Sequence, residues 1–380
     1  MTSKLRPMVV LFGYDTSAFT QKARYILRLK QIPYTFITVP TMMPRPVLKN
    51  YFNLEYRKIP VAAIDKDIYV DTSVIIEALE HRYSSNDGYG TVYPISADGR
   101  VHRSMMRGFA SYWTDRPFFR AVCGFMPTAL WRSKFGTDRA GLIGHKLDPD
   151  KLEKKIPLHL SQFDLQLSLL EPQFREASED LPWIFSTKTP SLADIALYHM
   201  VEWSEKMSRG EGLDHLTGGD AEEGQGEGCA AVFNSDRYPG AWAWFHNLQN
   251  YLNRLPLLET RVDGSDTAQV DRVLSALAEV PLDTKIPMVP TPAAEHTELD
   301  VRNGLTVGTD VSIAPDDTGM NDLTKGKILA LSPEEVVISP SMIGGASPKV
   351  GDLRLHFPRI HFRFQPQLLA RAGDQLSANL

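Results

Sequence analysis

Short apolar runs alternate with amphipathic stretches over the first hundred residues. Residues 8–12 (MVVLF) are apolar, and a short polar segment separates them from a stretch with apolar side chains at helical spacing, from Phe19 to Leu27. That spacing is typical of a helix with one buried face. The pattern therefore predicts a strand, a glycine-containing turn and an amphipathic helix that begins at Ser17.

A second pattern of this kind follows a proline. Pro60 precedes two apolar runs within 61–70, and these lead to Asp71 and Thr72, whose residue types often cap helices. Proline lowers the cost of a cis peptide, and a cis-proline before a strand turns the preceding backbone outward. We expect a cis-proline, two strands and a helix over 74–83.

Both predicted helix starts carry groups that suit a charged ligand. Unpaired backbone N–H groups and the positive end of the helix dipole favour an anion or a thiolate beside Ser17. At the second start, the Asp71 carboxylate and the Thr72 hydroxyl suit a ligand with both an ammonium and a carboxylate. A serine at a helix start is far more often a structural cap than a catalytic residue, so the pattern needs further support.

The order of these elements is that of a thioredoxin-like domain, and the motifs resemble those of the glutathione transferase family. The resemblance implies that Ser17 activates the thiol of glutathione. It also implies that the backbone of Ile59, which precedes Pro60, pairs with the cysteinyl part of glutathione. Asp71 and Thr72 would then hold the γ-glutamyl end.

Tyr14 is an alternative thiol activator, because a tyrosine has this role in other classes of the family. We favour Ser17, whose alignment with the helix start contains no gap, although Ala18 replaces a common proline. A free thiol has a pKa near 8.5, and lowering it by about two units needs ~2.7 kcal/mol, within reach of a hydroxyl hydrogen bond and a helix N-terminus. Ser17 would act as a donor, since the sequence contains no GxSxG nucleophile elbow.

Ser191 and Asp194 have the spacing of a capping box at the start of an apolar helix. A plain helix start is a sufficient explanation. The same element also resembles the buried capping box in the helical domain of glutathione transferases, and residues 238–256 look like the last helix of that domain.

The resemblance also implies a pocket for the electrophilic substrate. A helical segment that includes 101–113 would line it. The side chains proposed for its wall are Tyr112, Trp113, Arg116, Phe118 and Phe119. Burial in the helical core explains each aromatic residue equally well when it is taken singly.

The fold class expected is an α/β thioredoxin-like domain (1–95) followed by an all-helical domain (96–280) and a small all-β domain. Within the helical domain, 210–228 is glycine-rich, acidic and poor in apolar residues, which predicts a mobile surface loop. Prolines make 281–302 a stiff, extended linker. Short β-type runs within 303–380 then predict an appended barrel or sandwich, similar to extensions of fungal transferase-like proteins.

Histidines and arginines gather near the C-terminus. They are Arg354, His356, Arg359, His361 and Arg363. A metal site would need more ligands at suitable spacing, so we predict no metal and interpret the alternating basic residues as the solvent face of a strand.

Composition narrows the function classes. The chain has 380 residues, 43% hydrophobic and 23% charged residues and a formal net charge of −5, which is ordinary for a soluble globular protein and gives no footprint for nucleic acid. Two cysteines are too few for a disulfide framework. With no signal peptide and no apolar run of transmembrane length, we expect a cytoplasmic protein that does not insert into a membrane.

The function that the resemblance implies is a glutathione-dependent enzyme, with glutathione as its co-substrate and a homodimer as its usual assembly. Its thiolate would attack a small electrophile, by conjugation or by addition–elimination that leads to isomerisation or dehydration. A role in fungal secondary metabolism or detoxification fits an extended chain of this type. The alternative is a non-catalytic scaffold that acts through its β-domain or its dimer surface.

Overall fold

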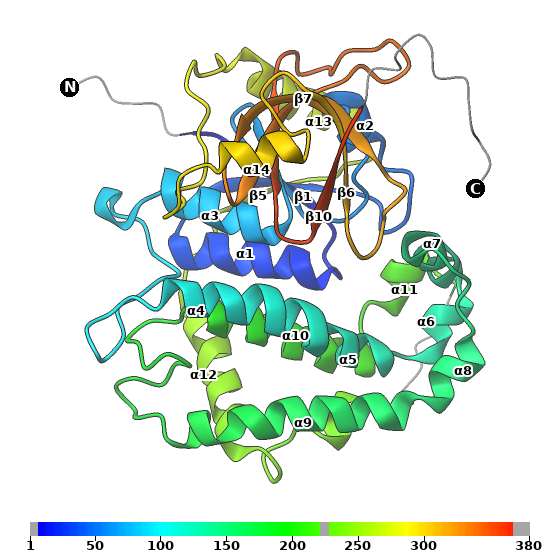
Figure 1. Cartoon of the computed structure of the whole chain (residues 1–380). Coiled ribbons are helices and arrows are strands. Elements are labelled where there is room, and N and C mark those ends of the chain that lie inside the picture. Colours follow the sequence, from blue (N-terminus) through cyan, green and yellow to red (C-terminus); the bar gives the residue numbers. More distant parts are fainter. Residues whose placement is uncertain (1–6, 221–227, 368–380) are drawn as a thin grey trace.

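One mixed sheet of ten strands organises the N- and C-terminal parts of the chain. The computed structural model describes residues 7–220 and 228–367 (Figure 1). The strand order is β10-β6-β7-β8-β9-β4-β3-β1-β2-β5. The strands are β1 (Val9–Gly13), β2 (Tyr34–Thr38), β3 (Val61–Ile64), β4 (Asp67–Val70), β5 (Glu259–Val262), β6 (Asp310–Pro315), β7 (Thr324–Leu331), β8 (Glu335–Pro340), β9 (Arg354–Pro358) and β10 (Phe362–Pro366).

The centre of this sheet confirms the predicted thioredoxin-like order. Strand β1 pairs in parallel with β2 and antiparallel with β3, and β3 pairs antiparallel with β4. The helices of this part are α1 (Ala18–Lys30), α2 (Pro46–Phe52), α3 (Thr72–Arg82) and the short 3-10 helix η1 (Ser85–Asp87). Alternation along β1 explains the layers, because Leu11 packs with α1 and α3 while Val10 and Phe12 pack with α2.

Both edges of the thioredoxin-like sheet are covered by later parts of the chain. Strand β5 pairs in parallel with β2, and α13 (Thr267–Glu279) packs its Val270 and Leu274 against the same core as Phe12. Strand β5 therefore belongs to the sheet and α13 packs against it, although we predicted both within the helical domain. Pairing satisfies the N–H and C=O groups that an open edge would leave exposed.

The C-terminal residues are rich in strands, as predicted, but they do not form a barrel or sandwich of their own. Strand β9 pairs in parallel with β4, so β6–β10 extend the N-terminal sheet and curve over it (Figure 1). Nor is 281–302 simply a free linker. Val289 is buried and donates its backbone N–H to Glu335, and α14 (Thr297–Arg302) ends the segment.

The remaining helices form the second part of the molecule, most of which lies below α1 in Figure 1. They are α4 (Arg103–Gly108), η2 (Phe109–Phe118), α5 (Phe119–Gly124), α6 (Thr128–Arg132), α7 (Lys134–Ile143), α8 (Pro149–Lys154), α9 (Ile156–Arg175), α10 (Leu192–Ser208), α11 (Leu213–Thr217), η3 (Cys229–Ala231) and α12 (Pro239–Arg254). Segment η2 is a π-helix that contains Pro117; proline lacks the N–H of a regular helical turn, and the wider turn accommodates it. Among the described residues, no helix is long and apolar enough to cross a membrane.

The capping box of α10 is formed as predicted and is fully buried. The Asp194 carboxylate accepts hydrogen bonds from the backbone N–H of Ser191 at 2.9 Å and from its hydroxyl at 2.6 Å. It also accepts from the backbone of Ile184 and from the Trp244 ring nitrogen, at 3.0 and 2.9 Å. One carboxylate therefore ties α10 to α12 and to the preceding loop.

The prediction of a surface loop over 210–228 is wrong in its first half. Leu213 and Leu216 are buried in α11 against the helical core. The acidic residues Glu222, Glu223 and Glu227 of that prediction lie outside the described residues.

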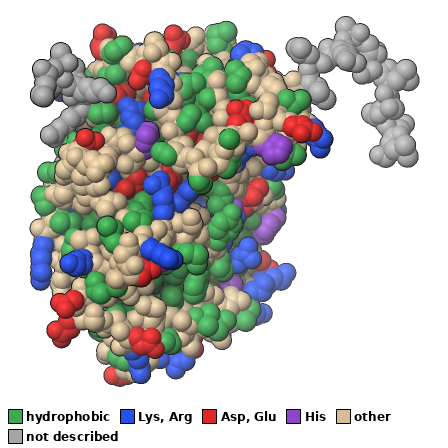
Figure 2. All heavy atoms as spheres, turned by 60° about the vertical axis from the view of Figure 1, so that its left-hand side comes forward, with side chains coloured by type: hydrophobic (Ala, Val, Ile, Leu, Met, Phe, Trp, Pro, Cys, Tyr) green, Lys and Arg blue, Asp and Glu red, His purple; other side chains and the backbone are tan. Residues whose placement is uncertain are grey.

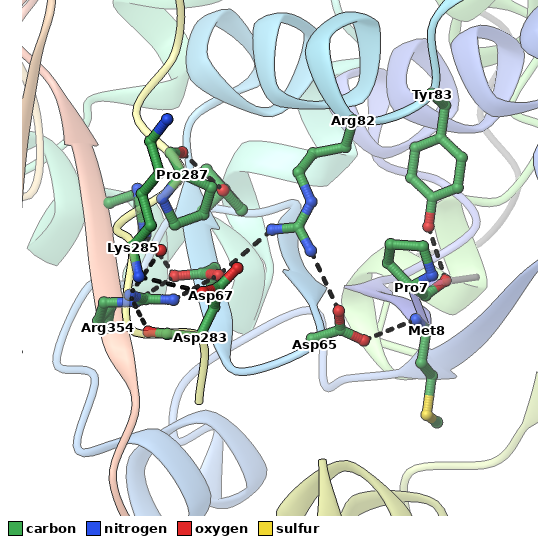
Figure 3. Close-up of polar contacts among 12 residues, drawn as sticks. Pro7, Met8, Asp65, Asp67, Arg82, Tyr83, Asp283, Lys285, Pro287 and Arg354 are labelled. Carbon is green, nitrogen blue, oxygen red and sulfur yellow. Dashed lines mark hydrogen bonds and ion pairs between the residues drawn. The ribbon is translucent and has the colours of Figure 1, made fainter. Parts of the chain in front are cut away.

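The prediction that Arg354 and His356 lie on a solvent face is also wrong. Both are buried where β9 joins β4, with 3% and 0% of their surface exposed. Arg354 forms an ion pair with Asp67 at 2.6 Å. Arg82 forms ion pairs with both Asp67 and Asp65 (Figure 3). The basic side chains point inward because acidic partners on the neighbouring strands accept them. Arg363 on the edge strand β10 is exposed, as predicted.

Charge is distributed evenly over the surface drawn in Figure 2. Basic, acidic and apolar side chains are interspersed there. Among the described residues, no group of three or more histidine, cysteine, aspartate or glutamate side chains is arranged to hold a metal ion.

Candidate functional site

The strand register brings the three predicted motifs to one edge of the sheet. Val61 at the start of β3 lies opposite Phe12 at the end of β1 and opposite Val70 at the end of β4. The segment that follows β1 leads to Ser17, the segment before β3 contains the cis Ile59–Pro60 bond, and the segment after β4 is Asp71-Thr72. Because these segments leave three adjacent strands at the same end, two helix N-termini and an outward-turned backbone meet there.

Ser17 is the N-cap of α1, and its backbone is extended, with φ −83° and ψ 120°. Its Oγ accepts a hydrogen bond from the backbone N–H of Thr20 at 3.2 Å. A hydroxyl that accepts through its oxygen can still donate its own hydrogen to a neighbouring anion. Only 8% of Ser17 is exposed, so this donor acts in a sheltered position beside the helix dipole.

Tyr14 lies in the same loop and is also buried. Its hydroxyl oxygen accepts a hydrogen bond from an Arg139 Nη2 at 3.0 Å, which leaves the Tyr14 hydrogen available for donation. Ser17 and Tyr14 can therefore each donate a hydroxyl hydrogen to a thiolate, and the geometry does not decide between them.

Asp71 is held in an unusual conformation at the start of α3. Its backbone φ is +76°, a value that residues other than glycine rarely adopt. Backbone strain of this kind often marks functional positions. One carboxylate oxygen, Oδ1, accepts from the backbone and the hydroxyl of Ser73 at 2.9 and 2.7 Å. The other oxygen has no hydrogen bond or ion pair with any residue that the structure describes, so it can accept from an ammonium.

Thr72 completes this helix start. Its side chain is nearly buried, and its hydroxyl likewise makes no hydrogen bond to the described parts of the chain. A hydroxyl and free backbone N–H groups beside the Asp71 carboxylate match the carboxylate and ammonium of a γ-glutamyl group. The donor set therefore fits the end of glutathione that the resemblance assigns to it.

Arginines that the sequence did not single out surround the same loops. Arg45 is 5% exposed and donates to the backbone carbonyls of Pro40, Thr41 and Arg57. Burial lowers its pKa to about 10, so it remains charged at neutral pH. Arg57 and Arg139 both form ion pairs with Asp138, and Arg57 also lies 3.8 Å from a second carboxylate, Asp322. Three cations beside two carboxylates leave a net positive charge among these five side chains, which favours an anionic ligand.

Known proteins support this assignment of the N-terminal part. Residues 11–87 match the family model of the glutathione S-transferase N-terminal domain. Residues 125–216 match a domain of unknown function, DUF7962. No curated protein matches the chain.

Solved structures show that the fold extends over almost the whole chain. A GST-like protein from Pseudomonas syringae is 20% identical, with a TM-score of 0.56, and the alignment covers 95% of this chain and 99% of that protein. A Tau class glutathione S-transferase from mango, Mangifera indica, is 16% identical over 71% of this chain and 98% of its own, with a TM-score of 0.44. The family match therefore concerns residues 11–87, the structure from Pseudomonas syringae shows that the chain shares the GST-like fold, and the fungal type stays a prediction.

An ion pair between a buried lysine and a partly buried aspartate joins the thioredoxin-like part to the helical part. Lys22 of α1 is 1% exposed, and its Nζ lies 2.7 Å from a carboxylate oxygen of Asp115 in η2. Burial raises the pKa of Asp115 against the opposing effect of Lys22. Helical spacing alone places Lys22 on a polar face of α1, and no local signal marks it as buried, because its partner lies far along the chain.

The predicted wall of the electrophile pocket is divided between different environments. Phe118 is buried in the helical core against Phe163, and Tyr112 is exposed beside His361. The Trp113 ring nitrogen donates to Gln166 at 2.5 Å. Phe119 packs against α1, with its ring 5.1 Å from that of Phe19.

Arg116, the basic member of that wall, points toward the C-terminal strands. It forms ion pairs with Asp316 and Asp317, which follow β6, at 3.3 and 3.0 Å. The five residues therefore do not line a single surface.

Two hollows of the surface lie away from these motifs. One has a volume of about 450 Å³ and is lined by residues such as Asn53, Asn321 and Ser341. The other has about 330 Å³ and lies near Arg175 and Tyr238. Neither offers convergent helix N-termini or excess positive charge, so the chemistry favours the sheet edge over these two hollows.

Proposed function

We propose that this protein is a glutathione-dependent transferase that presents a glutathione thiolate to a small electrophile. The observation that carries the proposal is the convergence of the Ser17, Ile59–Pro60 and Asp71–Thr72 segments at one end of three paired strands. The match of residues 11–87 to the glutathione S-transferase N-terminal domain supports it.

In this proposal Ser17 donates its hydroxyl hydrogen to the sulfur, and the first turn of α1 adds the positive end of its dipole. Arg139, through Tyr14, and Arg45 add positive charge nearby. Glutathione, when bound, supplies the thiol that attacks the electrophilic carbon. A thiolate fraction that rises from a few per cent to a majority at pH 7 needs a pKa lower by about two units, or ~2.7 kcal/mol.

The other residues orient the tripeptide. The free oxygen of Asp71 accepts from the γ-glutamyl ammonium, and Thr72 donates to its carboxylate. The backbone of Ile59, turned outward by the cis bond to Pro60, pairs with the cysteinyl amide. We propose further that the protein acts as a homodimer on electrophiles of secondary metabolism or detoxification, by conjugation or by addition–elimination.

Replacing Ser17 by alanine tests the proposal. Ser17→Ala should raise the pKa of bound glutathione by about one to two units and slow the conjugation of a model electrophile roughly tenfold or more at pH 6.5, because the sulfur loses its donor. The measurements are thiolate absorbance near 240 nm as a function of pH and single-turnover rates. If both stay at wild-type values, Ser17 is not the activator, and a loss in Tyr14→Phe would transfer the role to Tyr14.

A matched control separates catalysis from helix stability. Asp266 caps α13 by accepting from the backbone N–H three residues on, at 3.0 Å, and both α1 and α13 contain 13 residues. Asp266→Ala should cost about 1 kcal/mol of stability, as Ser17→Ala does, and leave the thiol pKa unchanged. Equal kinetic losses in the two variants would point to general destabilisation.

The alternative function is a non-catalytic protein of the same fold. It is favoured by one observation, the ion pairs that already engage Lys58 and Arg116 with Asp317 beside the cis-proline. Calorimetry at millimolar glutathione distinguishes the two, because the absence of binding heat from folded protein would contradict the enzyme and leave the scaffold.

A further inference from the structure

The loop between β6 and β7 lies against the candidate thiol site. Asp317 in this loop forms ion pairs with Lys58 at 2.5 Å and with Arg116 at 3.0 Å. Farther along the loop, the backbone N–H of Gly319 donates to the carbonyl of Leu142 at 2.7 Å. The C-terminal strands thus contact the segment before the cis-proline, the π-helix and the end of α7 at once.

The loop between β6 and β7 contacts the chain directly beside the cis-proline. Lys58 precedes the Ile59–Pro60 bond by one residue. Burial, together with the charges of Asp71 and Asp317, raises the pKa of the Tyr56 hydroxyl, so both carboxylates lie within electrostatic range of one side chain. The cis-proline segment is therefore flanked by two carboxylates from different parts of the chain.

The two carboxylates have different partners. Asp71 keeps one oxygen free, whereas Asp317 contacts a cation with each oxygen. Burial disfavours the charged form of Asp317, but Lys58 and Arg116 outweigh it and hold its pKa below the usual value. About a quarter to a third of each of these three side chains is exposed, so solvent and ligands can reach the cluster.

A bound tripeptide would run from Asp71 past Ile59 toward these cations. Its γ-glutamyl end lies at Asp71 in the proposed function, and its cysteinyl part lies at the Ile59 backbone. The remaining glycyl carboxylate would then approach Lys58, the cation nearest to Ile59 in the chain. Lys58 is the group that Asp317 already neutralises.

Resting on the proposed function, we infer that Asp317 is a specificity-determining residue of the thiol site. Its carboxylate takes the position that a ligand's terminal carboxylate would take between Lys58 and Arg116. A thiol peptide that ends in a carboxylate competes with Asp317, and one that ends in a neutral amide does not. The C-terminal strands thus select ligands by the charge at one end of the peptide.

Binding of glutathione and of its C-terminal amide to wild type and Asp317→Asn tests this inference by calorimetry. The substitution keeps the shape of the side chain and removes its charge. We expect glutathione to bind roughly tenfold more tightly to the variant, because removing a like charge relieves the competition, and the amide to change by less than about twofold. Asp316→Asn should have a smaller effect, since among the described residues the Asp316 carboxylate pairs with Arg116 alone, at 3.3 Å, and not with Lys58.

Asp310→Asn is the control, because Asp310 lies on β6 in a comparable exposed ion pair, with Lys327 at 3.0 Å. Its affinities should match those of wild type. Equal changes for both ligands in Asp317→Asn, or no change, would overturn the specificity role while leaving the proposed function intact. If neither ligand binds to any of these proteins, the proposed function fails and the inference fails with it.

Discussion

His356 provides the sharpest test of how the C-terminal strands are attached to the sheet. It is fully buried on β9, with Nδ1 2.6 Å from Glu335 on β8 and Nε2 2.9 Å from Asp67 on β4. Carboxylates accept and do not donate, so both ring nitrogens carry hydrogens and the side chain is an imidazolium. Burial acts to lower the pKa of His356, but the two carboxylates outweigh it and raise that pKa above its usual value.

Replacing His356 by glutamine should cost about 3–5 kcal/mol, the range expected when one partner of a buried ionic network is removed. The two carboxylates are affected unequally. Asp67 keeps Arg354 and Arg82, as Figure 3 shows. Glu335 is fully buried, and among the described residues its carboxylate keeps one hydrogen-bond donor, the backbone N–H of Val289 at 2.7 Å. Most of the cost therefore lies in the uncompensated charge of Glu335.

The assay is urea unfolding monitored by fluorescence and by circular dichroism. If the two transitions coincide, one free energy of unfolding describes both. The double variant His356→Gln with Glu335→Gln should recover much of the loss, because neither charge is then left unpaired. His361→Gln is the control. Among the described residues the His361 side chain makes one long hydrogen bond, 3.3 Å to the carbonyl of Ser111, so its loss should cost less than about 1 kcal/mol. A single variant within 1 kcal/mol of wild type, or a double variant no better than the single one, would refute the reasoning.

The same network predicts a pH dependence. Because the folded pKa of His356 is raised, its contribution is fully present below the unfolded value of about 6.5 and is lost as the pH rises through the folded pKa. The stability difference between wild type and His356→Gln should therefore shrink as the pH is raised from 6 to 9. A difference that grows over this interval would contradict an imidazolium at this position.

Two further variants test buried carboxylates elsewhere. Asp194→Ala removes the acceptor of four hydrogen bonds in the core and should lower the free energy of unfolding, measured in urea, by about 3 kcal/mol or more. Glu298→Ala, in the exposed ion pair with Arg302, should change that free energy little. Lys22→Met leaves Asp115 without its cation and should cost about 3 kcal/mol, most of it regained by adding Asp115→Asn. If Lys22→Met proves neutral, the ion pair does not stabilise the contact between the two parts of the molecule.

Local sequence determined the features whose partners lie close along the chain. The cap at Ser17 depends on Thr20, the capping box of Ser191 depends on Asp194, and the cis bond at Pro60 depends on the proline itself. The thioredoxin-like order could be predicted for the same reason, because alternation and helical spacing report which faces are buried within one element. These features include every segment of the proposed thiol site.

Only the tertiary structure decided what covers each face and edge. The local sequence predicts that Arg354 and His356 are exposed, because their partner Asp67 lies almost 300 residues earlier in the chain. The pairing of β4 with β9 brings Asp67 to them. Lys22 and Lys58 likewise find their carboxylates at long range. Periodicity shows that a side chain faces one side of its element, but whether water or another segment lies there depends on how distant strands pair.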